Sequence, residues 1–365
     1  MQTVIPWGDP KAQKRWGSEL AVQSLAKSYF TRKFVGKGDN NIIEQKDELE
    51  SGAGDRVSFD LSMQLRGKPT TGDKRLDGNE EGLKFYTDEV IIDQTRKAVN
   101  CGATMSQKRT AHNLRQVGRS RLSDYWAKYL DELYFIYLAG ARGINEDFIE
   151  DENFTGHAGN AIQPPDSQHI LFGGSATSKA TITAADKMDV AVVERAVTNA
   201  KMMRATDPDA ANMVPVTIGS DNHFVMVMSP YQEHDLRTTA GAQNWLEIQK
   251  AAAAAEGSKN KIFTGRLGMI NNAVLHCHES SIRFNDYGAG SDVLAARALF
   301  MGRQAAVVAY GFTNKSRMSW KEKKKDYDND HNVASGTIIG AKKTRFNNRD
   351  FGVQAIDTAA APPSN

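Results

Sequence analysis

The feature that most constrains this chain is a stretch in which apolar and polar residues alternate strictly. Every second position is apolar: Val57, Phe59, Leu61, Met63 and Leu65. A period of two predicts a strand with one buried face. A second extended stretch runs from Leu83 to about Val99, and the polar segment 67–82 between the two contains four glycines and a proline. We therefore predict a long two-stranded ribbon with a wide, charged tip.

Such a ribbon needs another surface, because an isolated two-stranded hairpin is marginally stable at best in water. Its apolar face, from Val57 to Leu65, can be covered only by folding back on its own chain or by a partner. The alternation therefore already indicates a chain that is completed by contact with something beyond the ribbon.

The segments on either side of the ribbon are predicted to be helical. The first 35 residues form an amphipathic, basic arm, with Leu25, Tyr29 and Phe30 at near-helical spacing. No proline occurs between Ser106 and Ala139, so this stretch is predicted to be one helix, with Ser106 as its N-cap and a length of about 50 Å.

The second half of the chain reads as a mixture of separate strands and helices. Segment 140–179 is predicted to be a loop, and Thr183 with Asp186 forms a capping box that predicts the start of a helix. A basic linker is expected at 315–325 and a frayed tail from Ala359. Further strands are predicted at 214–218, 224–228, 274–277, 305–310, 337–344 and 351–356, with a helix at 244–256. Because strands and helices are segregated, the fold class is α+β and not a doubly wound sheet.

Composition narrows the class of protein. The 365 residues carry 46 basic and 44 acidic side chains, 40% of the chain is apolar, and a formal charge of +2 argues against a dedicated nucleic-acid binder. Two cysteines, Cys101 and Cys277, indicate no disulfide framework. No secretory signal or membrane span is evident, so we expect a soluble intracellular product.

Motifs for catalysis are weak. His276-Cys277-His278-Glu279 is the best metal candidate, which leaves a metal-dependent hydrolase as an alternative, but the second half of a zinc pattern is missing and a structural strand explains it as well. Asp326, Asp328 and Asp330 imitate the start of a calcium loop that lacks its diagnostic Gly and Glu. No phosphate loop or GxSxG elbow occurs, so no cofactor is predicted.

Three charged groups remain as candidate binding residues. The basic run Lys321, Lys323, Lys324 and Lys325 is either a DNA-facing surface of a nucleic-acid-binding module or a solvated linker. Basic residues on the ribbon tip either keep the chain soluble or meet an acidic run on another copy. The tip residues are Lys68, Lys74 and Arg75, and the acidic run is Glu146, Asp147, Glu150 and Asp151.

The order of these pieces resembles the Hong Kong 97-type fold of tailed-phage major capsid proteins, in its N-four-like podovirus branch. The stretches that carry the resemblance include Gly52-Ala-Gly-Asp-Arg-Val-Ser-Phe, Phe85-Tyr-Thr-Asp-Glu-Val-Ile-Ile-Asp-Gln, Pro165-Asp-Ser-Gln-His-Ile-Leu-Phe-Gly-Gly, Ser229-Pro-Tyr-Gln-Glu-His-Asp-Leu-Arg-Thr and Gly340-Ala-Lys-Lys-Thr-Arg-Phe-Asn. They span almost the whole chain.

The resemblance implies a structural coat subunit and no enzyme. It implies an N-terminal arm (1–50), an E-loop hairpin (51–100), a peripheral domain (101–185) with spine helix 106–139, an axial domain (186–315), and return strands with a tail (316–365). Copies would form hexamers and pentamers of an icosahedral head around double-stranded DNA, with separate scaffolding, portal and decoration proteins. The chain would be found in the virion and, during assembly, in the host cytoplasm, without a membrane partner. Some members carry a Lys–Asn crosslink, for which Lys68 or Lys74 with Asn347 or Asn348 have the right residue types.

Overall fold

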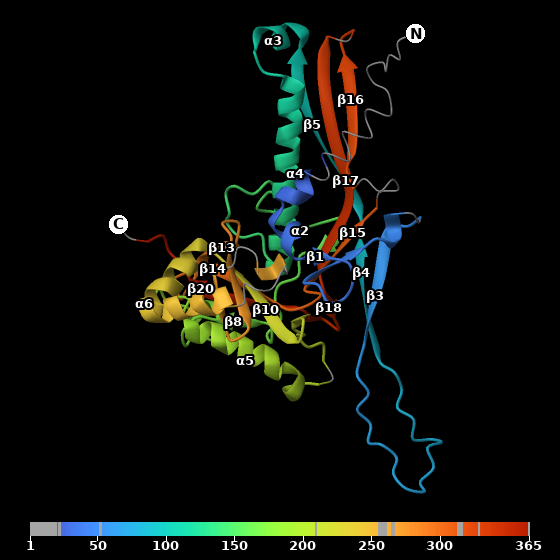
Figure 1. Cartoon of the computed structure of the whole chain (residues 1–365), viewed down its shortest axis with the longest axis vertical. Helices are drawn as coiled ribbons and strands as arrows, with labels where there is room; N and C mark the ends of the chain where they lie inside the picture. The colour runs from blue at the N-terminus through green and yellow to red at the C-terminus, as the bar shows by residue number, and fades with distance from the viewer. Residues whose placement is uncertain are drawn as a thin grey trace.

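A computed structural model shows a mixed helix and sheet body with two projections in opposite directions (Figure 1). One projection is a tower of long strands and a helix, and the other is a thin hairpin. The structure describes residues 20, 23–50, 53–208, 210–254, 261–263, 267–311, 317–327 and 329–363.

The helix of the tower is α4 (Leu114–Ala139), which runs from the tower into the body (Figure 1). A short helix, α3 (Thr104–Arg109), precedes it. The prediction of one continuous helix from Ser106 was therefore wrong, because the helix is interrupted at residues 110–113. Asn113 is the N-cap of α4, and its side chain accepts a hydrogen bond from the Gln116 amide. At 26 residues, α4 is about 39 Å long. Its C-terminal half is buried on every side, so it is a core helix there and not an amphipathic one.

Among the described residues the strands form two large sheets. The first runs β1–β2–β15–β17–β16, with β5 also paired to β17; the second runs β11–β12–β10–β14–β20–β8, with β13 on β14 and β9 on β10. In the first sheet the bounds are β1 Val35–Gly36, β2 Ile43–Lys46, β5 Asp93–Ala103, β15 Ala306–Tyr310, β16 Ser319–Lys325 and β17 Asp330–Lys343. In the second they are β8 Ile170–Phe172, β9 Val216–Ile218, β10 Asp221–Met228, β11 Gly268–Ile270, β12 Ala273–Cys277, β13 Arg283–Tyr287, β14 Val293–Met301 and β20 Val353–Ala359.

The smaller elements complete the body. Helices α5 (Val190–Thr206) and α6 (Pro230–Ala254) pack on the second sheet through a separate apolar cluster. The remaining strand pairs are β3 Arg56–Ser62 with β4 Phe85–Ile91, β6 Gly156–His157 with β7 Asn160–Ala161, and β18 Arg345–Phe346 with β19 Arg349–Asp350. Short helical turns lie at η1 Glu48–Glu50, η2 Lys179–Thr181 and η4 Lys261–Phe263.

Three further local predictions are corrected. Thr183 and Asp186 form a turn before α5, which begins at Val190 with Asp189 as its N-cap. The basic linker is not a linker over its described part, because Ser319–Lys325 is strand β16. The tail does not fray at Ala359, which is buried within β20.

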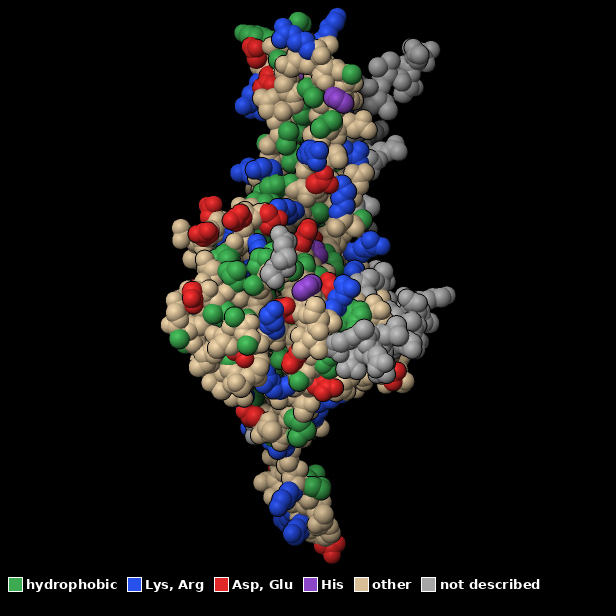
Figure 2. Space-filling view, turned by 90° about the vertical axis from the view of Figure 1, so that its left-hand side faces the viewer, with side chains coloured by type: hydrophobic (Ala, Val, Ile, Leu, Met, Phe, Trp, Pro, Cys, Tyr) green, Lys and Arg blue, Asp and Glu red, His purple; other side chains and the backbone are tan. Residues whose placement is uncertain are grey.

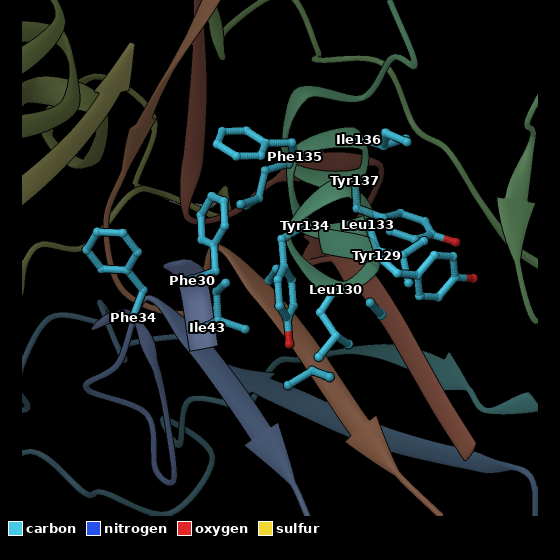
Figure 3. Close-up of a cluster of buried hydrophobic side chains, with 14 of the residues drawn as sticks. Phe30, Phe34, Ile43, Tyr129, Leu130, Leu133, Tyr134, Phe135, Ile136 and Tyr137 are labelled. Atoms are coloured by element: carbon cyan, nitrogen blue, oxygen red, sulfur yellow. The ribbon is translucent and has the colours of Figure 1, made fainter. Parts of the chain in front are cut away.

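The described part of the arm is pinned to α4. Helix α2 (Tyr29–Lys33) places Phe30 against Tyr134 and Phe135, with ring centroids 5.6 and 4.8 Å apart (Figure 3). The buried Asp131 carboxylate of α4 accepts hydrogen bonds from the Ser28 hydroxyl (2.8 Å) and from two backbone amides at the start of α2, those of Tyr29 (2.8 Å) and Phe30 (3.0 Å). A carboxylate at a helix N-terminus satisfies amides that have no partner within the helix.

A buried ion pair joins α4 to the second sheet. Arg297 on β14 donates to both carboxylate oxygens of Asp357 on β20, each at 2.7 Å, and to the carbonyl of Ala139 at the end of α4 (2.6 Å). The Tyr287 hydroxyl donates to the same carboxylate (2.7 Å). One residue pair therefore ties the spine helix and three strands together.

We expect the pH dependence of folding to change when Asp131 is replaced by Asn. Burial raises the pKa of Asp131 to about 6 from 3.8, although its hydrogen-bond donors oppose this shift. The folded subunit therefore retains a proton between about pH 4 and pH 6 that the unfolded chain has released, so this group's contribution to stability is fully present below pH 4 and is lost as the pH rises through 6. Two pKa units correspond to about 3 kcal/mol.

Urea unfolding of the unassembled subunit at pH 4, 5, 6 and 7 measures this effect. The free energy of unfolding of the wild type should fall with rising pH by up to about 3 kcal/mol more than that of Asp131→Asn. Identical pH profiles for the two proteins would show that Asp131 does not titrate in this way.

Candidate functional site

The hairpin formed by β3 and β4 is the most exposed part of the described chain, and its root is firmly held. Val57, Phe59 and Val90 are buried in a cluster with Val307 and Ala309 of β15 and with Phe346 and Phe351. The Phe59 and Phe346 rings meet edge to face at 6.0 Å. The chain itself therefore covers the first part of the alternating face that the sequence predicted.

Beyond Ser62 the hairpin leaves the body. The two strands stay paired for seven residues, and one further ladder bond joins the Met63 amide to the Lys84 carbonyl at 2.9 Å. Four large apolar side chains in this distal part are more than half exposed: Leu65 (55%), Leu76 (64%), Leu83 (64%) and Phe85 (56%). Figure 2 shows this extension below the body, with hydrophobic side chains beside charged ones. Exposed apolar side chains at this density on one projection make the distal hairpin the candidate interaction site.

The exposed apolar residues do not all lie on the predicted face. Phe85 pairs with Ser62, so it lies on the polar side of the ribbon, opposite the side that Leu61 and Tyr86 share. Sequence reasoning did not single out Leu76, Leu83 and Phe85, which the structure shows to be exposed, although a signal was present: large apolar residues in or beside a polar, glycine-rich tip.

The tip is internally ordered by a carboxylate. Glu81 accepts hydrogen bonds from the backbone amides of Arg66 and Gly67 across the loop, which lowers the pKa of its carboxyl group. Between residues 63 and 84 there are five basic and four acidic side chains, a net charge of +1. The tip is therefore close to neutral and carries Lys68, Lys74 and Arg75 as exposed groups.

The acidic run lies in the loop after α4 and is partly used within the chain. Asp147 forms an ion pair with Lys128 (2.9 Å). The Glu132 carboxylate on α4 accepts from the backbone amides of Ile149 and Glu150, each at 2.7 Å, which fixes the loop. Glu146 and Asp151 are exposed, and Glu150 is half-buried. Within the described part of one chain, the structure does not join these carboxylates to the tip residues Lys68, Lys74 and Arg75.

The basic run is split between two faces because it forms strand β16. Lys321, Lys323 and Lys325 are exposed on one face. Glu322 on the other face accepts from Arg115 of α4 (2.6 Å) and from the indole of Trp320 (2.8 Å). Lys324 is on this inner face, so the four predicted lysines do not form one surface.

The metal candidates are structural in this fold. His276 is fully buried with its Nε2 atom 2.8 Å from the Ile262 carbonyl. His278 contacts the rings of Tyr29 and Phe135, and burial lowers its pKa to about 4. Burial raises the pKa of the Cys277 thiol to about 12. The described ranges contain no group of three or more His, Cys, Asp or Glu side chains that could hold a metal ion.

Two further predictions concern turns. Asp328 of the calcium-like sequence lies outside the described residues, and Asp326 lies in the turn between β16 and β17 with a positive φ of 51°. Asn347 and Asn348, the crosslink candidates, form the exposed left-handed turn between β18 and β19.

No helix in the described chain has both the length and the apolar character that a membrane crossing requires.

Three comparisons with known proteins agree with one another. The sequence profile of the family described as "Phage capsid protein" matches residues 4–362. The major capsid protein of Pseudomonas phage KPP25 is 27% identical over 366 residues, covering 91% of each chain. The capsid of Ralstonia phage GP4 is 60% identical with a TM-score of 0.90 and full coverage of both chains. The capsid of Cyanophage Pam1 shares the fold at 22% identity, with a TM-score of 0.71 and coverage of 93% of this chain and 94% of that one.

Proposed function

This chain belongs to the phage capsid protein family, and from that premise we propose how its parts build a capsid. It is a major capsid protein with the Hong Kong 97-type fold, a structural component of the virion and not an enzyme. The predicted fold, function and non-enzymatic role are thus confirmed. The narrower N-four-like assignment stays a prediction.

The observation that carries the mechanism is the distal hairpin, which exposes four large apolar side chains and is held at its root. We infer that the hairpin of each subunit lies on a neighbouring copy and that this contact builds hexamers and pentamers. Half-exposed Leu65, Leu83 and Phe85 become buried there, and burial of apolar surface is the main favourable term in association. Obligate interfaces commonly bury more than about 2,000 Å², which a projecting arm supplies without a larger body.

The charged residues are proposed to act around this apolar contact. Lys68, Lys74 and Arg75 are exposed in the same tip as the apolar residues and would meet carboxylates of the neighbour, for which exposed Glu146 and Asp151 are candidates. Asp147 and Glu150 are weaker candidates, since one is paired with Lys128 and the other is half-buried. Because surface ion pairs contribute little free energy, these charges would select orientation more than they would strengthen binding.

The remaining parts follow the same proposal. Residues 1–50 are the arm, 51–100 the E-loop hairpin, 101–185 the peripheral domain, 186–315 the axial domain, and 316–365 the return strands and tail. The shell would enclose double-stranded DNA and assemble in the host cytoplasm with scaffolding, portal and decoration proteins.

Electron microscopy of purified recombinant protein tests the proposed function. We expect capsomers or closed icosahedral particles, from the chain alone or after addition of its scaffolding protein. A subunit that stays monomeric at high concentration in both conditions would contradict the proposal.

The exposed face of β16 is the proposed DNA-facing surface. Adjacent side chains on one strand face are about 6.8 Å apart, so Lys321, Lys323 and Lys325 present a row of three ammonium groups. Because each phosphate contact releases counterions, replacing all three lysines by Gln should reduce the slope of log K against log salt by about 2.7 for duplex DNA.

Fluorescence anisotropy of a labelled duplex with unassembled subunits, between 50 and 200 mM salt, measures the slope. Lys324→Gln is the matched control, since this lysine is on the same strand but on the inner face, and it should leave the slope unchanged. Equal slopes for the wild type and the triple variant would remove β16 from DNA binding.

A further inference from the structure

The direction in which the hairpin projects is determined where β4 ends and β5 begins. Ile91 is the last residue of β4, which pairs with β3, and Asp93 is the first residue of β5, which pairs with β17. The chain therefore passes from the hairpin into the tower within two residues. The contacts of Ile91 therefore help to set the angle between the two projections, together with the buried cluster at the hairpin root.

One side chain binds both backbone groups of Ile91. The Asn160 amide donates through Nδ2 to the Ile91 carbonyl (2.7 Å), and its Oδ1 accepts from the Ile91 amide (3.0 Å). Asn160 is buried, with an exposed fraction of 4%. Its carboxamide thus replaces the neighbouring strand that Ile91 lacks on that side.

Asn160 is itself fixed by the spine helix. It lies in the β6–β7 hairpin, whose two turn residues, Ala158 and Gly159, both have positive φ, 57° and 78°. The Tyr137 hydroxyl of α4 donates to the Asn160 carbonyl (2.8 Å) and accepts from the His157 amide (2.6 Å).

The same turn also contacts the tower sheet. His157 Nε2 lies 3.0 Å from the Ile339 carbonyl of β17. Next to it, a Cβ on Gly340 would be 2.0 Å from the Ile91 carbonyl oxygen, so only glycine allows β17 to approach the hairpin root this closely. The β6–β7 turn therefore connects α4, β17 and the root of the hairpin.

We propose that Asn160 is a positioning residue that sets the angle of the hairpin to the spine helix, and thereby its alignment with a second copy of this chain. The proposal rests on the proposed function. Without the carboxamide, the hairpin keeps its apolar contact residues but points in a range of directions, so contacts between copies form out of alignment.

Asn160→Ala in the full chain tests the proposal, with Asn145→Ala as a matched control. Asn145 is also buried, and its amide binds two backbone groups in the same way, the Ser281 carbonyl and the Arg283 amide, each at 3.0 Å. The two variants therefore lose the same kind and number of hydrogen bonds, but only Asn160 contacts the hairpin root.

We expect amide hydrogen exchange in unassembled Asn160→Ala to be about tenfold faster at residues 91–93, with wild-type rates in α4. Shells viewed by electron microscopy should be fewer and variable in diameter. Asn145→Ala should exchange normally at 91–93 and form shells of wild-type diameter. Wild-type exchange and uniform shells from Asn160→Ala, or equal damage to shells by Asn145→Ala, would overturn the proposal.

Tyr137→Phe provides a second test if Asn160→Ala does not fold. It removes only the hydroxyl that holds the turn, so exchange should rise at His157 and, less strongly, at Ile91. Unchanged exchange at both positions would contradict the coupling. The exchange measurement uses unassembled protein, so it decides the role of Asn160 even if the wild type forms no shells and the proposed function fails.

Discussion

Replacing Leu83 and Phe85 by Ser should leave the subunit folded and prevent it from assembling at wild-type concentrations. Both side chains are more than half exposed on the free hairpin, so the isolated fold loses almost nothing. In a contact between copies each loses about 1.5 kcal/mol of apolar burial, about 3 kcal/mol for the pair. This raises the concentration required for assembly by more than about 100-fold.

Light scattering and electron microscopy across a concentration series measure this effect, with thermal unfolding to confirm the fold. The matched control is Gln64→Ser with Thr71→Ser, which changes two exposed polar residues of the same hairpin and should assemble normally. Deleting residues 67–82 should also abolish assembly. Normal shells from the Leu83 and Phe85 variant would refute the hairpin contact.

The second large effect is expected from Arg297→Ala. This change leaves the Asp357 carboxylate buried without its positive partner and frees the Ala139 carbonyl at the end of α4. Removing one member of a buried ion pair typically costs about 3–5 kcal/mol. The free energy of unfolding in urea should fall by that amount, and α4 should lose the hydrogen bond that its Ala139 carbonyl accepts from β14.

A double variant separates the cost of the unpaired charge from the loss of packing. Arg297→Leu with Asp357→Leu removes both charges, so it should be more stable than Arg297→Ala by at least about 2 kcal/mol. A single variant as stable as the wild type would show that water, and not Arg297, compensates Asp357.

The periodicity of apolar residues correctly predicted strands whose own sequence shows the buried face. Strand β3 follows the alternation from Val57, and the buried strand at Ala306–Tyr310 follows its apolar run. Strand β16 also alternates, with Trp320 facing inward. Its inner face contains the charged residue Glu322, so the sequence pattern indicates a charged linker and not a strand with a buried face. The partner that allows Glu322 to lie there is Arg115 of α4, which is distant in sequence.

Features that depend on distant contacts were not predictable in this way. The boundary between β4 and β5 is held by Asn160, 69 residues further along the chain. The break between α3 and α4 contains neither Pro nor Gly, so Asn113 was not distinguished from Ser106 as an N-cap. The sequence placed the candidate site at the ribbon tip and named only its charged residues, and this placement stays a prediction; the exposed fractions of Leu83 and Phe85 depend on how the hairpin leaves the body, which its local pattern does not encode.

The contrast between the root and the end of the hairpin has a consequence for shells of mixed curvature. Seven paired residues and a buried cluster stiffen the root, whereas the segment 63–84 has few ladder bonds. A subunit that occupies both five-fold and six-fold environments requires one part whose orientation stays fixed and another whose conformation adapts to the position of the neighbouring subunit. The same polypeptide can then form shell regions of different curvature without a change in its globular body.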